Sequence, residues 1–444
     1  MASITQYPSI YNSAYVPNVF VVDGLGAADR YVLQVRTAGG TVLANFKQPA
    51  NASGVGIFDV QRVLQSYLSS EIFVQETEKV TSTPGALFRY QVFYGTETGT
   101  ESLLTNQGIT YTVINAYDNW RVINSDLFPF LPTPTPEDCE LSPDIYAVYP
   151  QTAEFLTNYP GTIPVTLNDW GTLSFFNIIN AGANNWVQNE APFWVRITTT
   201  LDGVSRNDVV YSISNDNGLN VRTDCNDPVV VYPSDAQRIG TVGTGPLNIA
   251  PLLNLSYDAY QVRIYSYNTC NTDPIIDCGD YADILDNYIG DLIFTKSYTL
   301  TAAACGRFEP IQLSFINQYG VTDYFTFNKR NTRQTVTERN NYTEYLGTWS
   351  APIFEINQQG RGTRTFSSNA KTSMTLSSDW MSDNVSEWLQ ELYQSPAVNI
   401  YVDGQWEPCN LMSNTYIQKT NARNKLFQHE VIVQFANNQK IQRG

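Results

Sequence analysis

The chain has 444 residues, and its 42 acidic against 26 basic side chains give a formal net charge of −16. This acidic surface repels nucleic acid as a whole and argues against a DNA-binding protein. Only 15% of the residues are charged, so Asn, Gln, Ser, Thr and Tyr must form much of the polar surface. A chain of this length predicts about two to four domains instead of one core.

The residue types favour strands over helices, because 28 Tyr and 21 Phe accompany abundant Thr and Val. The N-terminal residues are polar and show no secretory signal. No segment approaches the roughly 18 consecutive apolar residues of a membrane span. Strand-rich compositions of this kind are typical of extracellular proteins. Proteins of virus particles reconcile these observations, because they fold in a reducing cytoplasm and then act outside the cell.

The six cysteines are scattered without a CxxC unit. We expect buried free thiols, while Cys270 and Cys278 could close a short loop in an oxidising medium. The full set is Cys139, Cys225, Cys270, Cys278, Cys305 and Cys409.

Residues 1–128 are predicted to form a first β domain. A short helix is expected after Asp59, a good N-cap residue, because apolar residues then recur at helical spacing through Leu68. The glycines before it are not followed by Gly-Lys-Ser/Thr, so they do not form a phosphate loop. The expected strands are 18–22, 30–36, 41–46, 87–94 and 109–114.

A proline-rich segment at 129–144 predicts a stiff, extended linker before a second β domain at 145–300. Strands are expected at 191–200, 208–214 and 260–267. Residues 240–253 resemble 54–68, and 260–267 resemble 88–94. Two copies of one β module would explain this similarity, and so would convergent β patterning.

The third domain is predicted at 301–444 and contains the clearest local pattern. Apolar residues from Val385 to Tyr393 recur at helical spacing, so a helix is expected at 384–394, with Asn384 as its cap and Glu387 completing a capping box. Strand 398–402 and a two-residue Asp403-Gly404 turn follow. In the last strand, one face is expected to carry Phe427, His429, Val431, Val433 and Phe435.

The sequence offers no candidate catalytic residue, cofactor site or metal site. His429 is the only histidine, which argues against histidine-based triads and zinc sites, and we expect it to pack at the core edge. The acidic run 277–286 has a spacing of three, which suits a calcium loop poorly, so a solvated loop is expected.

Two basic loops are the most local charge feature of this acidic chain. We expect them either to contact acidic faces of neighbouring subunits, to face the lumen of an assembly, or to be solvated. The candidate residues are Lys329, Arg330, Arg333 and Arg339 in the first loop, and Arg361 and Arg364 in the second.

Several segments resemble tail-associated structural proteins of tailed phages that infect Bacteroidota, including crAss-like phages. In the N-terminal region they are Tyr7-Pro8, the stretch Asn-Val-Phe-Val-Val at 18–22 and the stretch Gly-Ile-Phe-Asp-Val-Gln-Arg-Val-Leu-Gln-Ser-Tyr-Leu at 56–68. Residues 315–327, Phe-Ile-Asn-Gln-Tyr-Gly-Val-Thr-Asp-Tyr-Phe-Thr-Phe, are similar to a stretch of the same proteins. The C-terminal helix, Ser395-Pro396 and three strands are similar to the tail-tube fold of tube, distal tail and ring proteins.

This resemblance implies a mainly β protein with two N-terminal β-sandwich-like domains and a C-terminal tail-tube-like β-sandwich or barrel with one packed helix. It implies a non-enzymatic virion protein that folds in the host cytoplasm. The protein would form a homo-oligomeric ring of sixfold or twelvefold symmetry in the tail, tail tip, baseplate or neck. Its other partners would be tail or neck proteins, with no membrane, and with DNA touched only where it passes through the lumen.

Two alternatives stay open. The eight Trp and many Tyr suit a carbohydrate-binding surface or a receptor-binding protein, although the Trp residues are spread along the chain. A hydrolase on a β scaffold is the other, because any two distant carboxylates can meet in a fold. Closed rings in electron micrographs would favour the ring protein, whereas glycan-binding monomers would favour the first alternative.

Overall fold

The computed structural model describes residues 2–69, 80–81, 87–116, 155–178, 192–212, 230–231, 237–240, 259–267, 289–300, 308–356, 362–416, 426–437 and 441–443, apart from residues 10, 100, 167–168, 176, 202–203, 345–346 and 414. The predicted mainly-β class is confirmed, with strands throughout and only short helices among the described residues. The chain divides into two compact units. Unit 1 comprises residues 1–303 and 316–324, and unit 2 comprises 304–315 and 325–444.

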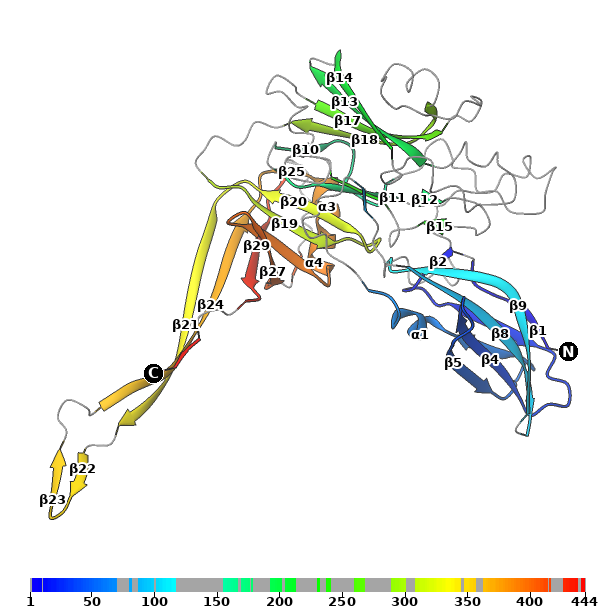
Figure 1. Ribbon diagram of the computed structural model, residues 1–444, viewed down its shortest axis with the longest axis horizontal. Helices are drawn as coiled ribbons and strands as arrows, with labels where there is room; N and C mark the ends of the chain where they lie inside the picture. Colours follow the sequence, from blue (N-terminus) through cyan, green and yellow to red (C-terminus); the bar gives the residue numbers. More distant parts are fainter. Residues whose placement is uncertain are drawn as a thin grey trace. The chain divides into compact units, whose positions relative to one another are not determined.

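The N-terminal part of unit 1 is a β-sandwich of two sheets around one core (Figure 1). The core joins buried side chains of both sheets, including Phe20, Phe58, Tyr31, Tyr90 and Tyr111. The five-stranded sheet has the order β2-β9-β8-β4-β5, and its strands are Tyr11–Ser13, Glu101–Ile114, Leu87–Thr98, Arg30–Thr37 and Val42–Gln48. The three-stranded sheet has the order β1-β3-β6, with strands Ser3–Gln6, Val19–Asp23 and Gly56–Asp59.

The predicted helix after Asp59 is present but shorter than expected. Helix α1 spans Gln61–Gln65, and Val60 rather than Asp59 is its N-cap residue. Asp59 ends β6, and its Oδ1 accepts hydrogen bonds from the backbone N–H of Gln61 at 3.0 Å and of Asn18 at 3.1 Å. The carboxylate therefore satisfies one N–H of the first helical turn from the strand before it.

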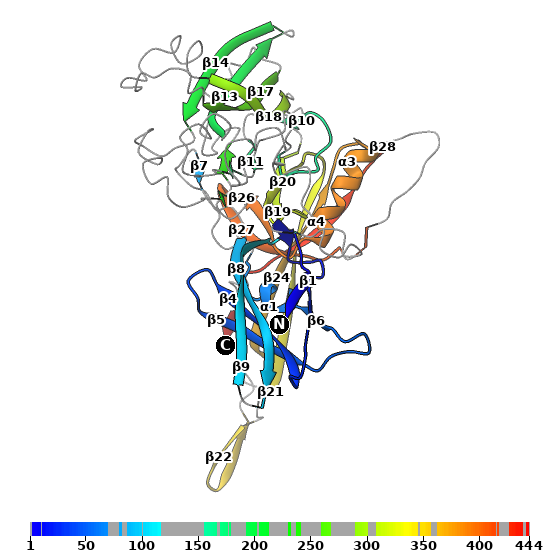
Figure 2. The same ribbon diagram turned by 90° about the vertical axis from the view of Figure 1, so that its right-hand side faces the viewer.

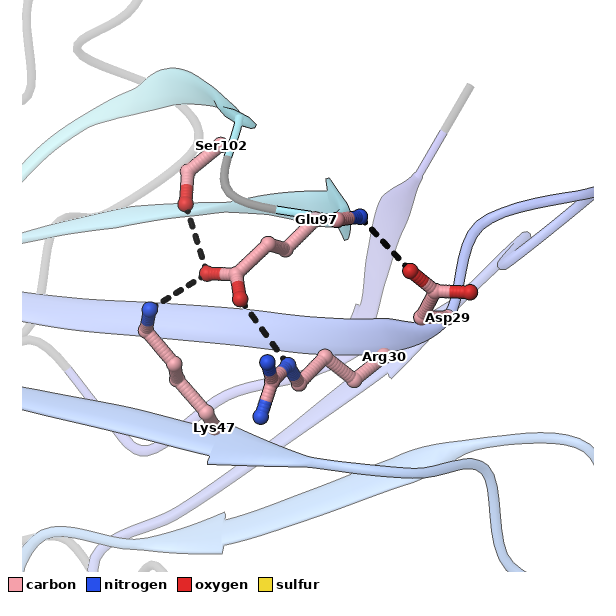
Figure 3. A network of polar contacts seen from close by, with 6 residues as sticks. Asp29, Arg30, Lys47, Glu97 and Ser102 are labelled. Atoms are coloured by element: carbon pink, nitrogen blue, oxygen red, sulfur yellow. Dashed lines mark hydrogen bonds and ion pairs between the residues drawn. The ribbon is translucent and has the colours of Figure 1, made fainter.

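One buried carboxylate joins four strands at the end of the five-stranded sheet (Figure 3). The side chain of Glu97 in β8 is only 2% exposed, and it pairs with Lys47 of β5 and with Arg30 Nε of β4 at 2.9 Å. Ser102 Oγ of β9 donates to it at 2.8 Å. A buried charge is tolerated only when it is paired and hydrogen-bonded, and here both conditions hold.

We expect this network to make the stability of the protein depend on pH in the acid range. The hydrogen bonds from Lys47 and then Ser102 lower the pKa of Glu97 below its ordinary value. A carboxyl with a lowered folded pKa stabilises the protein above its unfolded pKa, about 4.3, and loses that contribution as the pH falls through the folded pKa. Glu97→Gln should therefore lower the melting temperature at pH 7, and the gap from wild type should narrow below about pH 4.

Glu101→Gln is the matched control for this prediction, because Glu101 lies on the same hairpin and is exposed. Melting curves of the three proteins across the acid range test the prediction. A gap between wild type and Glu97→Gln that stays constant with pH would show that the loss comes from packing and not from the charge.

Unit 1 also contains a second five-stranded sheet, of order β10-β18-β17-β13-β14. Its strands are Ile163–Val165, Ile289–Leu300, Ala259–Tyr267, Pro192–Leu201 and Val204–Ser212. Small sheets contain β7 (Val80–Thr81), β11 (Thr172–Phe175), β12 (Asn177–Ile178), β15 (Val230–Val231) and β16 (Gln237–Gly240). The strands predicted at 191–200 and 260–267 are confirmed. The linker 129–144, the acidic run 277–286 and the helical part of the repeat at 241–253 lie outside the described residues.

Unit 2 is built on an eight-stranded sheet of order β20-β19-β26-β27-β29-β24-β21, in which β30 also pairs with β24. The strands are Thr322–Phe327, Ile311–Ile316, Val398–Val402, Gln405–Leu411, Glu430–Phe435, Gly362–Ser377, Asn331–Glu344 and Ile441–Arg443. A separate pair is formed by β25 (Met381–Ser382) and β28 (Leu426–Phe427).

The C-terminal pattern is largely confirmed. Val398, Ile400 and Val402 are buried in alternation, and Asp403 and Gly404 both adopt positive φ, as a two-residue hairpin turn requires. In β29 the buried face is also as expected. His429 itself lies between β28 and β29, not inside a strand.

The predicted helix 384–394 is present as two short helices that meet at the buried Leu389. Helix α3 spans Asp383–Trp388 and α4 spans Gln390–Gln394. The predicted capping by Asn384 is wrong, because Ser382 is the N-cap residue and makes no side-chain capping hydrogen bond. Trp388 packs against two rings of the sheet, Phe315 and Phe325, with centroid separations of 5.5 and 6.1 Å. Figures 1 and 2 show α3 beside β19 and β20.

Candidate functional site

The candidate site is a long β-ribbon of unit 2, which we call the arm and define as residues 329–377. Strands β21 and β24 pair antiparallel from Asn331 opposite Leu376 to Glu344 opposite Gly362. Only the base of the ribbon lies in the core, where Met374 and Leu376 are buried. From there the ribbon runs outward, with β21 exposed along nearly its whole length (Figure 1).

Of the candidate basic residues, Arg333, Arg339 and Arg364 lie in strands of this ribbon, so the prediction that they occupy loops is wrong for these three. Lys329 and Arg330 directly precede β21, Arg333 and Arg339 lie within β21, and Arg364 lies within β24. Most of the first predicted loop is thus strand β21, and the described end of the second is the start of β24. The many Thr residues between the charges suit an extended chain, and pairing with β24 satisfies the backbone groups on one side of β21. Arg361 lies outside the described residues.

Ion pairs on the arm are few and solvent-exposed. Lys329 Nζ lies 2.8 Å from Asp379 Oδ2, and Arg364 Nε lies 2.6 Å from Glu344 Oε2. The Arg333 guanidinium lies 5.1 Å from the centre of the Phe435 ring at the base. Exposed pairs of this kind contribute about 0–1 kcal/mol each, so they add little to the stability of the arm. Arg330 and Arg339 are exposed and make no ion pair within the described part of the chain.

The arm is basic in an acidic chain. Residues 329–377 contain seven Lys or Arg and three Glu, a net charge of +4. Because the whole chain carries −16, the remaining residues carry −20. The arm and the rest of the chain therefore carry opposite net charges.

The far end of the arm carries a short apolar hairpin, which we call the tip and define as residues 347–356. Strands β22 (Gly347–Ser350) and β23 (Ile353–Ile356) pair so that Trp349 lies opposite Phe354. Residues opposite each other share a face, as do residues two apart, so Ile356 joins this pair on one face. Trp349 is 68% exposed, Ile356 59% and Phe354 42%. The tip is therefore an exposed apolar surface at the end of a polar ribbon.

His429 belongs to a polar cluster that packs against α3. Its Nε2 lies 2.7 Å from Ser386 Oγ, which lies 3.0 Å from the Tyr416 hydroxyl. That hydroxyl donates to the Ser386 carbonyl at 2.8 Å, so all three contacts are satisfied when His429 Nε2–H donates to Ser386 and Ser386 donates to Tyr416. Ser386 is buried and the Tyr416 ring stacks on the His429 ring. The arrangement fixes α3 and matches the expected packed histidine.

Among the described residues, no group of three or more His, Cys, Asp or Glu is placed to hold a metal ion. Across the same residues, no helix has the length and apolar character needed to cross a membrane. Cys409 is a free, buried thiol, as expected, and burial raises its pKa to about 12. The other five cysteines lie outside the described residues.

Comparisons of the sequence with protein-family models and with curated proteins find no match. The arm is thus the candidate site on its geometry and charge alone. Sequence reasoning found its basic residues but not its shape or its tip. The apolar residues of the tip fall within a stretch of only ten residues, where no helical or alternating pattern extends far enough to be read.

Proposed function

We propose that this chain is a non-enzymatic structural subunit of a phage particle, which assembles with copies of itself into a ring in the tail or neck. The observation that carries the proposal is the arm. Its two strands, of 14 and 16 residues, extend beyond the sheet, and the arm is basic whereas the chain as a whole is acidic. The resemblance of the N-terminal and C-terminal segments to tail-associated proteins supports the placement in a virion.

The free edge of β21 supports the same proposal. Within the described sheet, β21 is the last strand, so the 14 residues of its outer side have no neighbouring strand. Soluble monomers avoid long exposed edges, because unpaired backbone groups pair with other chains. A partner that covers the arm removes this liability, and a contact between two different surfaces closes into a ring when the rotation between copies allows it.

Shortening the arm tests the proposal without touching the core. Asn340 pairs directly with Ser367, so a variant in which Asn-Gly replaces residues 341–366 closes the two strands with a two-residue hairpin turn. It keeps Met374 and Leu376 at the base and the pairing of β24 with β29 and β30. We expect the full chain to form closed rings in negative-stain micrographs and the shortened chain to stay monomeric in sedimentation experiments.

Circular dichroism serves as the control, because the shortened protein should lose only the strand signal of the deleted residues and keep the melting temperature of the full chain. Raising the salt concentration should weaken assembly of the full chain, since exposed charges are screened within about 10 Å at 0.1 M salt. A full chain that stays monomeric at every concentration, or that binds glycans as a monomer, would overturn the proposal.

A further inference from the structure

The tip of the arm has a surface that the described part of the chain leaves exposed. A two-stranded hairpin is only marginally stable by itself in water. The tip has four residue pairs, and Trp349, Phe354 and Ile356 on one face are all exposed. Exposed aromatic residues in such a cluster mark a contact surface, and Trp is among the residues that contribute most to binding.

We infer that the tip is the anchoring contact of assembly and that it seats in an apolar site on a second copy of this chain. The inference rests on the proposed function and assigns different roles to the ribbon and to the tip. The basic ribbon attracts the acidic body of the second copy and so raises the rate of encounter. The apolar tip then determines how slowly the two copies separate, because buried apolar contacts act mainly on dissociation.

The charges of the tip and of the arm indicate that the tip binds a second copy and not a lipid surface. The tip carries Glu355 between its two exposed isoleucines, Ile353 and Ile356, and a carboxylate is costly to place in hydrocarbon. The −20 on the residues outside the arm instead complements its +4, which favours another copy of the same chain.

The test compares a tip variant with a control that removes an exposed Trp elsewhere. Trp349→Ala with Phe354→Ala removes the apolar face, whereas Trp380→Ala removes a Trp of similar exposure, 62% against 68%, that lies outside the arm. In sedimentation equilibrium of the full chain, the tip variant should raise the dissociation constant of assembly roughly 30-fold or more. The Trp380→Ala chain should assemble like wild type.

A photo-reactive amino acid at position 349 identifies the occupant directly. It should cross-link one copy to another, and mass spectrometry should map the attachment outside residues 329–377. Cross-links confined within one copy would overturn the inference. Flotation with vesicles of phosphatidylcholine and phosphatidylglycerol would overturn it too, if wild type floats and the tip variant does not.

The two proposals fail in different ways. If the tip variant assembles as tightly as wild type while the shortened arm abolishes assembly, the ribbon alone makes the contact; the inference then falls and the proposed function stands. If wild type itself never assembles, both fall.

Discussion

Trp388→Ala should lower the free energy of unfolding of unit 2 by about 3–5 kcal/mol, the range for truncating a buried aromatic side chain. Trp388 is only 4% exposed and contacts the rings of Phe315 in β19 and Phe325 in β20. Its removal leaves a cavity between α3 and the sheet and weakens the attachment of the helix. Because the chain has more than one unit, a single melting temperature does not isolate this loss.

Hydrogen exchange measured by mass spectrometry reports the loss of stability in unit 2 separately from unit 1. Peptides from β19, β20 and α3 should exchange faster in the Trp388→Ala protein, while peptides from the N-terminal β-sandwich should not change. Trp380→Ala is the control, since this side chain is 62% exposed and its truncation leaves no cavity. Equal exchange in wild type and Trp388→Ala would mean that the helix is not anchored by this ring.

The elements that the sequence predicts correctly are those with a short-range hydrophobic period. Val398, Ile400 and Val402 alternate strictly, and the following Asp403-Gly404 pair is the strongest short hairpin signal, so strand, turn and buried face all agree with the structure. The strands of the N-terminal sandwich are found for the same reason. The helical spacing around Trp388 likewise predicts α3 and α4, because one apolar face has to meet the sheet.

The arm could not be predicted in this way, because β21 is polar on both faces and has no apolar period to read. Its conformation comes from pairing with β24, whose first residue lies 18 positions after the last residue of β21. The Glu97 network could not be predicted either, since the partners of Glu97 come from three other strands and meet only in the folded sandwich. Contacts between distant segments leave no periodic signal in the sequence.

A substitution in the tight turn between β19 and β20 should cause the second large loss of stability. Both the backbone conformation of Gly320 and its close neighbours disfavour a side chain there. Its φ is +76°, a conformation that disfavours any side chain, and a Cβ atom there would lie only 2.0 Å from the Asn115 carbonyl oxygen. Within the same turn, Asn317 accepts from the backbone N–H of Tyr319 and donates to the Leu156 carbonyl at 2.8 Å. The turn is therefore held on both sides, so the backbone has little room to move away from an added methyl group.

Gly320→Ala should accordingly destabilise unit 1 by about 2–5 kcal/mol, which combines roughly 1–2 kcal/mol for the left-handed conformation with roughly 1–3 kcal/mol for overpacking. Gly161→Ala separates the two causes, since Gly161 has a φ of +66° but no atom within 4 Å of the added Cβ. It should lose only the conformational part. Urea unfolding followed by hydrogen exchange around residues 155–173 and 311–324 measures both variants. Equal losses at the two glycines would show that the turn yields to the methyl group and that the contact with Asn115 does not hold it in place.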